Sequence, residues 1–319
     1  MRRPIVSILI PTFDRPHLLA QAIASALDQT VSDIEVVVGD DGDRGEAIVS
    51  ATGDARVRHQ RNERRLGMSG NWQRLLDTAQ GTFVLLLMDD DRLQPRFLER
   101  CLADFDEDPS LGVVFTNVAF AREDGSPDIL RRCDLRAGRH DRFAETFVRL
   151  KPVGISAALW RAEIWPAIRP LPDTASADMV IFGRIADLGW PFSYVDEPLM
   201  RYRVHQSNYS RGLQFREDGV RAWESLSFRD AGAQRQRDRR LAQSLLSRAA
   251  VEVRNDSLAA ARRDVRRAWT LDKKSWRRAL ALAVAASDRR LAQGARCWAR
   301  LNRDRWAKRA AASQHHVSG

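Results

Sequence analysis

Short apolar runs alternate with segments of helical periodicity through the first part of the chain. The apolar runs are rich in β-branched residues and predict buried strands at residues 5–10, 34–38, 57–59, 83–88 and 113–117. Between them, apolar residues recur every three or four positions and predict helices at residues 16–29, 45–51, 69–79 and 95–106. This alternation predicts an α/β fold class, in which a mostly parallel sheet is covered on both faces by helices.

The pattern changes beyond residue 117. The next predicted elements are helices at 143–150 and 179–187 and strands at 155–160 and 192–195. After Tyr209, Ala, Arg and Leu dominate, and helical periodicity predicts an antiparallel all-α appendage with helices at residues 239–254, 257–270 and 274–286. We therefore expect two domains, an α/β domain over residues 1–212 and a basic helical domain over residues 213–319.

The charge is distributed unevenly between these two parts. The whole chain of 319 residues carries a net charge of +10, but residues 213–319 carry +14 and residues 1–212 carry −4. Such a basic segment fits either solvated arginine-rich helix faces or a surface for an anionic partner. The charge pattern alone leaves both readings open.

Hydrophobic stretches and cysteines indicate the cellular compartment in which the protein is expected. No stretch approaches the roughly 18 apolar residues that span a bilayer. The N-terminal apolar run is short and lacks a following cleavage site of small residues, so we interpret it as a strand rather than a signal peptide. The cysteines Cys101, Cys133 and Cys297 are odd in number and widely spaced, which favours a reducing compartment over a disulfide framework. We expect a cytoplasmic protein.

Clusters of aspartates follow two of the predicted strands. Asp40 and Asp41 end the second strand, and Asp89, Asp90 and Asp91 end the strand at 83–88. Adjacent carboxylates repel each other unless a cation neutralises them, and Mg²⁺ or Mn²⁺ prefers such oxygen ligands together with substrate phosphates. Ligands also bind at the carboxyl ends of strands in sheets of this kind. The alternative is an acidic loop that caps the next helix. The position of both clusters at strand ends favours a metal site.

Six segments in order resemble signature segments of glycosyltransferase family 2. The first contains Pro-Thr-Phe-Asp-Arg, where the family has Pro-Thr-Tyr-Asn-Arg, and the second ends in Asp-Asp-Gly. The fourth carries an Asp-x-Asp pattern, and the last resembles Pro-Leu-x-x-Tyr-Arg-x-His. The segments cover residues 6–15, 34–42, 62–71, 85–95, 176–189 and 196–205. Phe13 and Asp14 depart from the family pattern, and Ala177 stands where many relatives have an acidic residue.

The resemblance implies a GT-A fold, which is Rossmann-like, and an inverting, metal-assisted transfer of a sugar from a nucleotide-diphosphate donor to an acceptor hydroxyl. It implies a role in polysaccharide or cell-surface glycan synthesis. The residues that it assigns to the nucleotide sugar are Pro11, Thr12, Phe13, Arg15, Asp40, Asp41, Gly67, Asn71, Asp89, Asp90 and Arg203.

The resemblance also assigns the metal ligands and the catalytic base. Mn²⁺ or Mg²⁺ is expected at Asp90, Asp91 and His205. The spacing from Pro95 makes Asp90 the principal ligand, whereas a literal Asp-x-Asp reading uses Asp89 and Asp91. Asp178 matches the general base that deprotonates the acceptor. A plain structural role for Asp178 is capping of the helix at 179–187.

Two other functions compete with this interpretation. A sugar nucleotidyltransferase would carry a glycine-rich phosphate loop after the first strand, and residues 11–14 contain no glycine. A non-catalytic protein would bind a membrane or nucleic acid through the basic helices, where four tryptophans suit either an interfacial helix or a packed core: Trp269, Trp276, Trp298 and Trp306. We expect no nucleic-acid partner. We expect the tail to bring the enzyme to the inner face of a membrane, near a glycan, lipid-linked or other hydroxyl acceptor.

Overall fold

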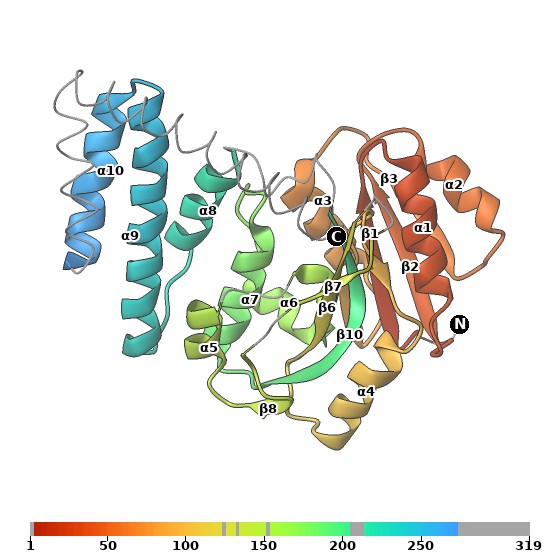
Figure 1. The fold of residues 1–319 in the computed structure, drawn as a ribbon. Helices are drawn as coiled ribbons and strands as arrows, with labels where there is room; N and C mark the ends of the chain where they lie inside the picture. Colours follow the sequence, from red (N-terminus) through yellow and green to blue (C-terminus); the bar gives the residue numbers. More distant parts are fainter. Residues whose placement is uncertain (1–2, 123–125, 132–133, 151–153, 205–213, 274–319) are drawn as a thin grey trace, which may run out of the picture. The chain divides into compact units, whose positions relative to one another are not determined.

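The computed structural model describes residues 3–122, 126–131, 134–150, 154–204 and 214–273 (Figure 1). The chain divides into two compact units, Met1–Gln234 and Arg235–Gly319. The predicted domain boundary after residue 212 lies among residues 205–213, outside the described residues, and stays a prediction. The first unit has the predicted α/β fold, and the described residues of the second unit, up to residue 273, form helices as predicted.

One sheet organises the first unit. Its main path follows the order β3-β2-β1-β4-β9-β6-β10-β5, while β7 pairs with β6 and β8 with β10. The strands are β1 (Val6–Thr12), β2 (Ile34–Asp40), β3 (Val57–Arg61), β4 (Phe83–Leu86), β5 (Arg92–Leu93), β6 (Val113–Arg122), β7 (Ile129–Leu130), β8 (Gly138–His140), β9 (Ala158–Arg161) and β10 (Phe192–Val204). Strands β3, β2, β1 and β4 are mutually parallel, as are β6 and β10, whereas β9 runs antiparallel between β4 and β6.

Helices pack on this sheet through apolar stripes. Helix α1 starts with Pro16, whose fixed φ suits the first turn, and it buries Leu19, Ala22, Ile23 and Ala26. The helices of this unit are α1 (Pro16–Leu27), α2 (Gly45–Thr52), α3 (Gly67–Thr78), α4 (Phe97–Glu107), α5 (Phe143–Leu150), α6 (Trp165–Ile168), α7 (Ala177–Leu188) and α8 (Gln214–Glu224). The helices predicted between the first five strands are all present.

Several strands differ in extent from the sequence prediction, and two of these differences shape the site. The segment predicted as a strand at 155–160 begins with a 3₁₀ turn, Ile155–Ala157, before β9, because the Ala157 N–H bonds the Gly154 carbonyl. Strand β10 continues well past residue 195, with register shifts on either side of Pro198. Proline lacks an N–H for the ladder, so an irregularity at this point is expected. These two features bring Ser156 and Arg203 to the acidic cluster.

Aromatic side chains join the sheet to the helices that follow it. The ring of Phe115 on β6 makes edge contacts with Phe143, Phe182 and Phe192, at centroid distances of 5.7, 5.0 and 5.7 Å. Edge-to-face pairs of this kind add to the stabilisation from burial alone. The packing of Phe182 fixes α7 against the sheet and thereby positions Asp178 in its first turn.

The described part of the second unit contains a helical hairpin of α9 (Ala231–Arg254) and α10 (Leu258–Leu271), with the first turn of α9 still in the first unit. Within the hairpin, Arg248 makes a two-pronged ion pair with Asp264, at 2.6 and 2.8 Å. The predicted helix at 274–286 lies outside the described residues. Among the described helices, none is long and apolar enough to cross a membrane.

Candidate functional site

The carboxyl ends of β1, β2 and β4 meet at one edge of the sheet. Thr12 at the end of β1 lies in register with Asp40 at the end of β2. The Thr12 hydroxyl donates to Asp89 Oδ2 at 2.8 Å, and the Thr12 carbonyl accepts from the Asp41 N–H at 3.1 Å. The structure therefore brings both acidic clusters to the same edge, with Thr12 between them.

The carboxylates of the second cluster face different partners. Asp91 is 3% exposed and accepts from the Ser156 hydroxyl at 2.7 Å and from the Arg203 backbone N–H at 3.3 Å. Asp89 is also buried, whereas Asp90 has the most accessible carboxylate of the three. One Arg15 nitrogen lies 3.1 Å from Asp90 Oδ2 and 3.4 Å from Asp89 Oδ1.

Burial disfavours the ionised forms of Asp89 and Asp91. Loss of solvation raises the pKa of Asp89 to about 6, although the Thr12 hydroxyl and Arg15 act against the rise. Loss of solvation, followed by repulsion from Asp90, raises the pKa of Asp91 to about 8. A cation near these oxygens would favour their charged forms.

The donor atoms fit a divalent ion that is shared with a substrate. Among the described residues, no group of three or more His, Cys, Asp or Glu side chains is arranged to hold a metal by itself. Mg²⁺, however, commonly takes only one or two protein carboxylates and completes its shell with water and phosphate oxygens. Arg15 already places a positive charge against Asp89 and Asp90. The third predicted ligand, His205, lies outside the described residues.

The carboxylate of Asp40 is buried and bonded to backbone groups, which indicates a structural role. Its carboxylate is fully buried and accepts from the N–H groups of Gly42 at 2.9 Å and Gly45 at 2.8 Å. His59 Nε2 lies 3.1 Å from its second oxygen. These contacts shape the turn after β2 and satisfy a backbone donor at the start of α2.

Asp41 is the more accessible member of the pair. It is partly exposed, and its Oδ1 accepts from Asn62 Nδ2 at 2.6 Å and from the Leu66 N–H at 3.1 Å. These contacts tie the loop before α3 to the end of β2. Of the two aspartates predicted to contact the nucleotide, Asp41 is therefore the better placed.

Asn71 and Gly67 lie on α3 beside this loop. The Asn71 amide donates to the Gly39 carbonyl at 2.8 Å, and its oxygen accepts from Asn62 Nδ2 at 3.1 Å. Asn71 is buried, so these bonds hold β2, α3 and the loop together. Gly67 has a φ of 73°, a conformation that favours glycine. Their predicted contact with the donor stays a prediction.

Phe13 presents an aromatic face at the edge of the site. It follows β1 and is 40% exposed, while Pro11 before it is largely covered. The guanidinium of Arg65 lies 3.9 Å from the centre of the Phe13 ring. A cation over a ring face is attracted by the ring's electrons. The motifs identified Phe13 but not Arg65, although Arg65 lies within the third signature segment.

A group of arginines lies beside the aspartates. Arg203 on β10 donates from Nε to the Asp90 carbonyl at 3.1 Å and from Nη2 to Gln21 Oε1 at 2.6 Å. Arg92 on β5 donates to the same Gln21 oxygen. Burial and repulsion from Arg203 and Arg201 lower the pKa of Arg92. Sequence reasoning found Arg203 but missed Gln21 and Arg92, because their contacts join segments far apart in the chain.

Asp178 lies in the first turn of α7, two residues after the N-cap Ser176. It is partly buried, and its Oδ1 accepts from the Met179 N–H at 2.8 Å. Burial raises the pKa of Asp178 to about 6. The segment before it is anchored to α3, because the Ser69 hydroxyl donates to the Thr174 carbonyl at 2.7 Å. The contacts described for Asp178 stay within its own helix.

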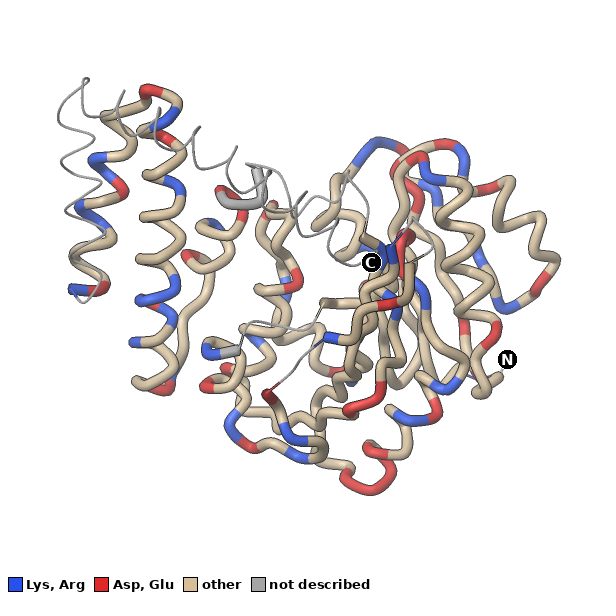
Figure 2. The backbone as a smooth tube through the Cα atoms, in the orientation of Figure 1, with Lys and Arg blue, Asp and Glu red and all other residues tan. Residues whose placement is uncertain are grey.

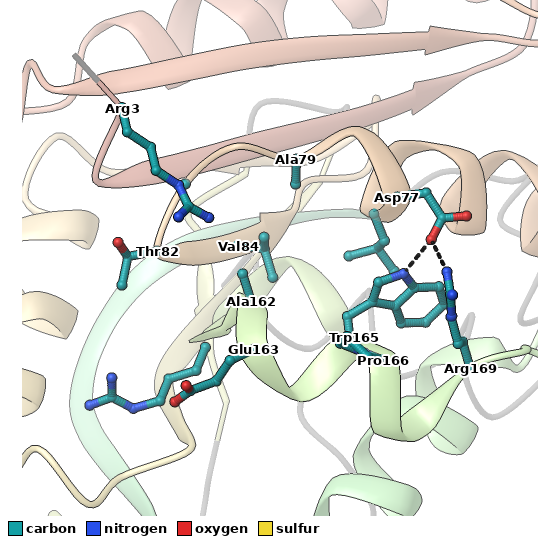
Figure 3. A pocket seen from close by; sticks show the side chains of 13 residues that line it. Arg3, Asp77, Ala79, Thr82, Val84, Ala162, Glu163, Trp165, Pro166 and Arg169 are labelled. Atoms are coloured by element: carbon teal, nitrogen blue, oxygen red, sulfur yellow. Dashed lines mark hydrogen bonds and ion pairs between the residues drawn. The ribbon is translucent and has the colours of Figure 1, made fainter.

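A separate cavity of about 450 Å³ opens near the amino end of β4 (Figure 3). The aspartates of the second cluster follow the other end of this strand and do not line the cavity. Asp77 in its wall accepts from Trp165 Nε1 at 2.7 Å and from Arg169 at 3.0 Å. Arg161 donates to the carbonyls of Leu111 and Pro109, both at 2.7 Å. These polar groups are satisfied by one another or by the backbone, so they do not point to a ligand.

Comparisons with known proteins agree with this geometry. The family model described as "Glycosyl transferase family 2" matches residues 7–154. Chondroitin synthase of Escherichia coli is 30% identical over 119 residues, which are 36% of this chain and 17% of that protein. A Campylobacter jejuni protein named GalNAc(5)-diNAcBac-PP-undecaprenol beta-1,3-glucosyltransferase is 38% identical over 95 residues, 28% of this chain and 31% of that protein. The chain thus spans less than a third of either curated relative.

The fold has a counterpart among solved structures. The crystal structure of S. aureus TarS 1-349 in complex with UDP-GlcNAc matches with a TM-score of 0.68 and 16% identity, covering 93% of this chain and 92% of that one. This likeness supports the predicted GT-A fold of the α/β unit. Residues 7–154 thus match glycosyltransferase family 2, and the signature motifs found in the sequence lie at the carboxyl ends of β1, β2 and β4.

Proposed function

We propose that the protein transfers a sugar, with inversion at the anomeric carbon, from a nucleoside diphosphate to an acceptor hydroxyl in the synthesis of a cell-surface glycan or polysaccharide. The observation that carries the proposal is the junction at the sheet edge, where Thr12 bonds Asp89 and the backbone of Arg203 bonds Asp91. It combines oxygen ligands for a cation with guanidinium groups for phosphates, inside a family 2 domain.

The donor would lie along the carboxyl ends of β1, β2 and β4. Phe13 offers a partly exposed ring on which a base can stack, and Asp41 offers a carboxylate for the base or ribose. The diphosphate would then reach Asp90, the most accessible carboxylate of its cluster, where Arg15 contacts the carboxylate and Arg203 the backbone carbonyl. UDP-GlcNAc is the first donor to test, because the structurally similar TarS was crystallised with it.

Charge stabilisation would drive the departure of the diphosphate. A divalent ion held by Asp90 and Asp91, with His205 as a further ligand, would supply positive charge where the leaving oxygen becomes negative. Arg203 would add hydrogen-bond donors to the same oxygens, and its backbone bond to Asp91 fixes its position. Fixed donors are effective because they need not reorganise as charge develops.

Asp178 would accept the proton of the attacking hydroxyl. Its pKa of about 6 leaves it mainly ionised at neutral pH, yet basic enough to take a proton. Ala177 beside it supplies no second carboxylate, so this role would fall to Asp178 alone. One carboxylate acting on the acceptor gives direct displacement, which inverts the anomeric carbon and needs no covalent intermediate.

Thermal unfolding with a panel of nucleotide sugars tests the donor site. A ligand that binds only the folded state raises the unfolding temperature. We expect one donor to do so in the presence of Mn²⁺ or Mg²⁺, and Asp90→Ala to abolish the shift. The matched control is Asp106→Ala, which removes an exposed aspartate of α4. An Asp90→Ala variant that keeps the full metal-dependent shift would contradict the proposal.

We also propose that the second unit makes peripheral contact with an anionic membrane that carries a lipid-linked acceptor. Figure 2 shows basic positions along α9 and α10. On α10, Trp269 is 46% exposed, and four arginines are exposed with it: Arg262, Arg263, Arg266 and Arg267. An exposed face with these residue types suits an interfacial helix. The named substrate of the Campylobacter relative is itself linked to undecaprenol.

Sedimentation with liposomes tests this contact. Replacing the four exposed α10 arginines with glutamine should reduce binding to vesicles that contain anionic lipid. The matched control replaces four exposed arginines of the first unit: Arg44, Arg96, Arg142 and Arg169. Equal binding by both variants and the unmodified protein would overturn the membrane role of α10 and leave the transferase proposal untouched.

A further inference from the structure

Two guanidinium groups converge on one neutral oxygen beside the aspartate cluster. Gln21 Oε1 accepts from Arg203 Nη2 at 2.6 Å and also from Arg92 Nη2. The Gln21 amide nitrogen lies 2.9 Å from His17 Nε2, one turn earlier on α1. Strands β5 and β10 pair at Arg92 and Arg201, so the arginines come from neighbouring strands and the glutamine from the helix packed beside them.

The charge of Arg92 is poorly compensated in this arrangement. Among the residues that the structure describes, its buried Nε has no hydrogen-bond partner and Arg92 forms no ion pair with a carboxylate. Arg201 differs, because Asp128 accepts from its Nε and Nη2 at 2.6 and 2.8 Å. Leaving a buried donor without a partner destabilises the protein, and more so when the group is charged. An amide oxygen is a weak partner for the Arg92 cation.

We propose that Arg92 and Arg203 form a binding site for a phosphate group, one oxygen of which takes the position that Gln21 Oε1 occupies here. The guanidinium fork matches the geometry of phosphate oxygens and binds them through two parallel N–H bonds. Gln21 is partly exposed on α1. A change of its side-chain rotamer would move Oε1 away and leave the N–H groups of the Arg92 guanidinium available to a phosphate.

The position of this site relates it to the transferase chemistry. Arg203 Nε donates to the Asp90 carbonyl, so the two arginines border the proposed diphosphate site directly. The phosphate has two possible sources, the diphosphate of the donor or a phosphate group of the acceptor. Only the assignment of the phosphate to the donor or to the acceptor rests on the proposed function. The binding of phosphate oxygens by the arginine pair stands without it.

Calorimetric titration of the full-length protein with inorganic pyrophosphate, in metal-free buffer, tests the site. We expect Arg92→Ala to weaken pyrophosphate binding at least tenfold, because it removes one of the two guanidinium groups of the site. The matched control is Arg96→Ala, which removes an exposed arginine paired with Glu99 on its own helix turn and should change affinity less than twofold. Equal affinity of Arg92→Ala and the unmodified protein, equal loss in both variants, or no pyrophosphate binding at all would overturn the proposal.

Two further variants separate this role from a purely structural one. Arg92→Lys keeps the charge but loses the fork, so its affinity should lie between those of Arg92→Ala and the unmodified protein. Gln21→Ala removes the oxygen that occupies the site, so it should bind pyrophosphate at least as tightly as the unmodified protein. Weaker binding by Gln21→Ala would show that the glutamine is part of the site rather than its substitute, and would overturn the proposed displacement.

A second pyrophosphate titration distinguishes a donor phosphate from an acceptor phosphate. It is carried out in the presence of a saturating concentration of the nucleoside diphosphate that belongs to the identified sugar donor. Loss of pyrophosphate binding assigns the site to the donor, and retained, Arg92-dependent binding assigns it to a phosphate of the acceptor. Arg92-dependent binding in a protein that transfers no sugar would refute the transferase function alone. Sugar transfer with pyrophosphate affinity unchanged in Arg92→Ala would refute only the phosphate site.

Discussion

At the scale of single residues, neighbouring carboxylates in this protein have different surroundings and therefore different chemistry. Asp40 is enclosed by backbone donors, while Asp41 remains accessible. In the second cluster, Asp91 is held by Ser156, and Asp90 is the accessible member. Sequence motifs locate each cluster, and the spacing from Pro95 favours Asp90 in the second, but they do not show the bonds that each carboxylate makes. Only the bonds made by each side chain separate a structural carboxylate from one that is available to a ligand.

Asp178 gives a prediction in which activity and stability move in opposite directions. Asp178→Asn keeps an oxygen for the Met179 N–H but has no carboxylate to accept a proton. We expect transfer to fall by about 10²–10⁴-fold, the usual contribution of a general base. The stability of the variant at neutral pH should rise, because it no longer buries a group whose ionised form is disfavoured by loss of solvation. Steady-state kinetics and urea unfolding measure the two effects.

The pH dependence of the same residue has a definite sign. The pKa of Asp178 is about 6 in the folded protein, above the ordinary value of 3.8. The folded state therefore holds the proton more tightly than the unfolded state. The contribution of this group to stability is fully present below pH 3.8 and is lost as the pH rises through about 6. The stability gained by Asp178→Asn should accordingly grow across that window, while transfer by the unmodified protein should decline below about pH 6. A gain that is constant from pH 4 to pH 7 would contradict this assignment.

At the scale of elements, the close approach of β2 and α3 supports the site. A Cβ added at Gly39 would meet Asn71 Oδ1 at 2.4 Å and Leu75 Cγ at 2.8 Å. Gly39→Ala should therefore destabilise the protein by about 1–3 kcal/mol through overpacking. Gly219→Ala is the matched control, because a Cβ at that position in α8 meets nothing within 4 Å and alanine favours a helix. Urea unfolding should show a loss for the first variant and none for the second.

Much of the secondary structure could be predicted because apolar runs and helical stripes are local features of the sequence. The first two strands, β1 and β2, and helix α1 between them follow from that pattern. The turn at Ser156 and the full length of β10 did not, because they depend on partners distant in the chain. The same limit applies to the site: motifs found Arg203, but not the glutamine and arginine that it meets. The roles assigned to Asp178 and to the individual metal ligands remain predictions.

At the scale of the whole molecule, the resemblance found in the motifs is confirmed by the family match and by the shared fold. The two compact units differ in character, since the first carries the sheet and its acidic edge, and the described part of the second is an arginine-rich helical hairpin. The sequence pattern predicted this contrast, because composition changes along the chain. The ion pair between Arg248 and Asp264 joins the two helices of the hairpin.

Stability of the second unit should depend on that ion pair. Arg248→Ala would leave the largely buried Asp264 carboxylate without its two-pronged partner. Removing one member of a buried ion pair lowers the free energy of unfolding by about 3–5 kcal/mol. Because Arg248 is partly exposed, we expect a smaller loss of about 1–3 kcal/mol here. Arg254→Ala, at the last residue of α9, is the control. A melting curve followed by circular dichroism should show the loss for Arg248→Ala, and an unchanged curve would contradict this role.

The most direct test of the central claim is the rate of sugar transfer, measured with and without Mn²⁺ or Mg²⁺, for the unmodified protein, Asp90→Ala and Asp106→Ala. We predict metal-dependent transfer that Asp90→Ala abolishes while the protein stays folded, and that Asp106→Ala leaves intact. Transfer by Asp90→Ala at the rate of the unmodified protein would contradict the proposal that the aspartate cluster binds the metal and the diphosphate.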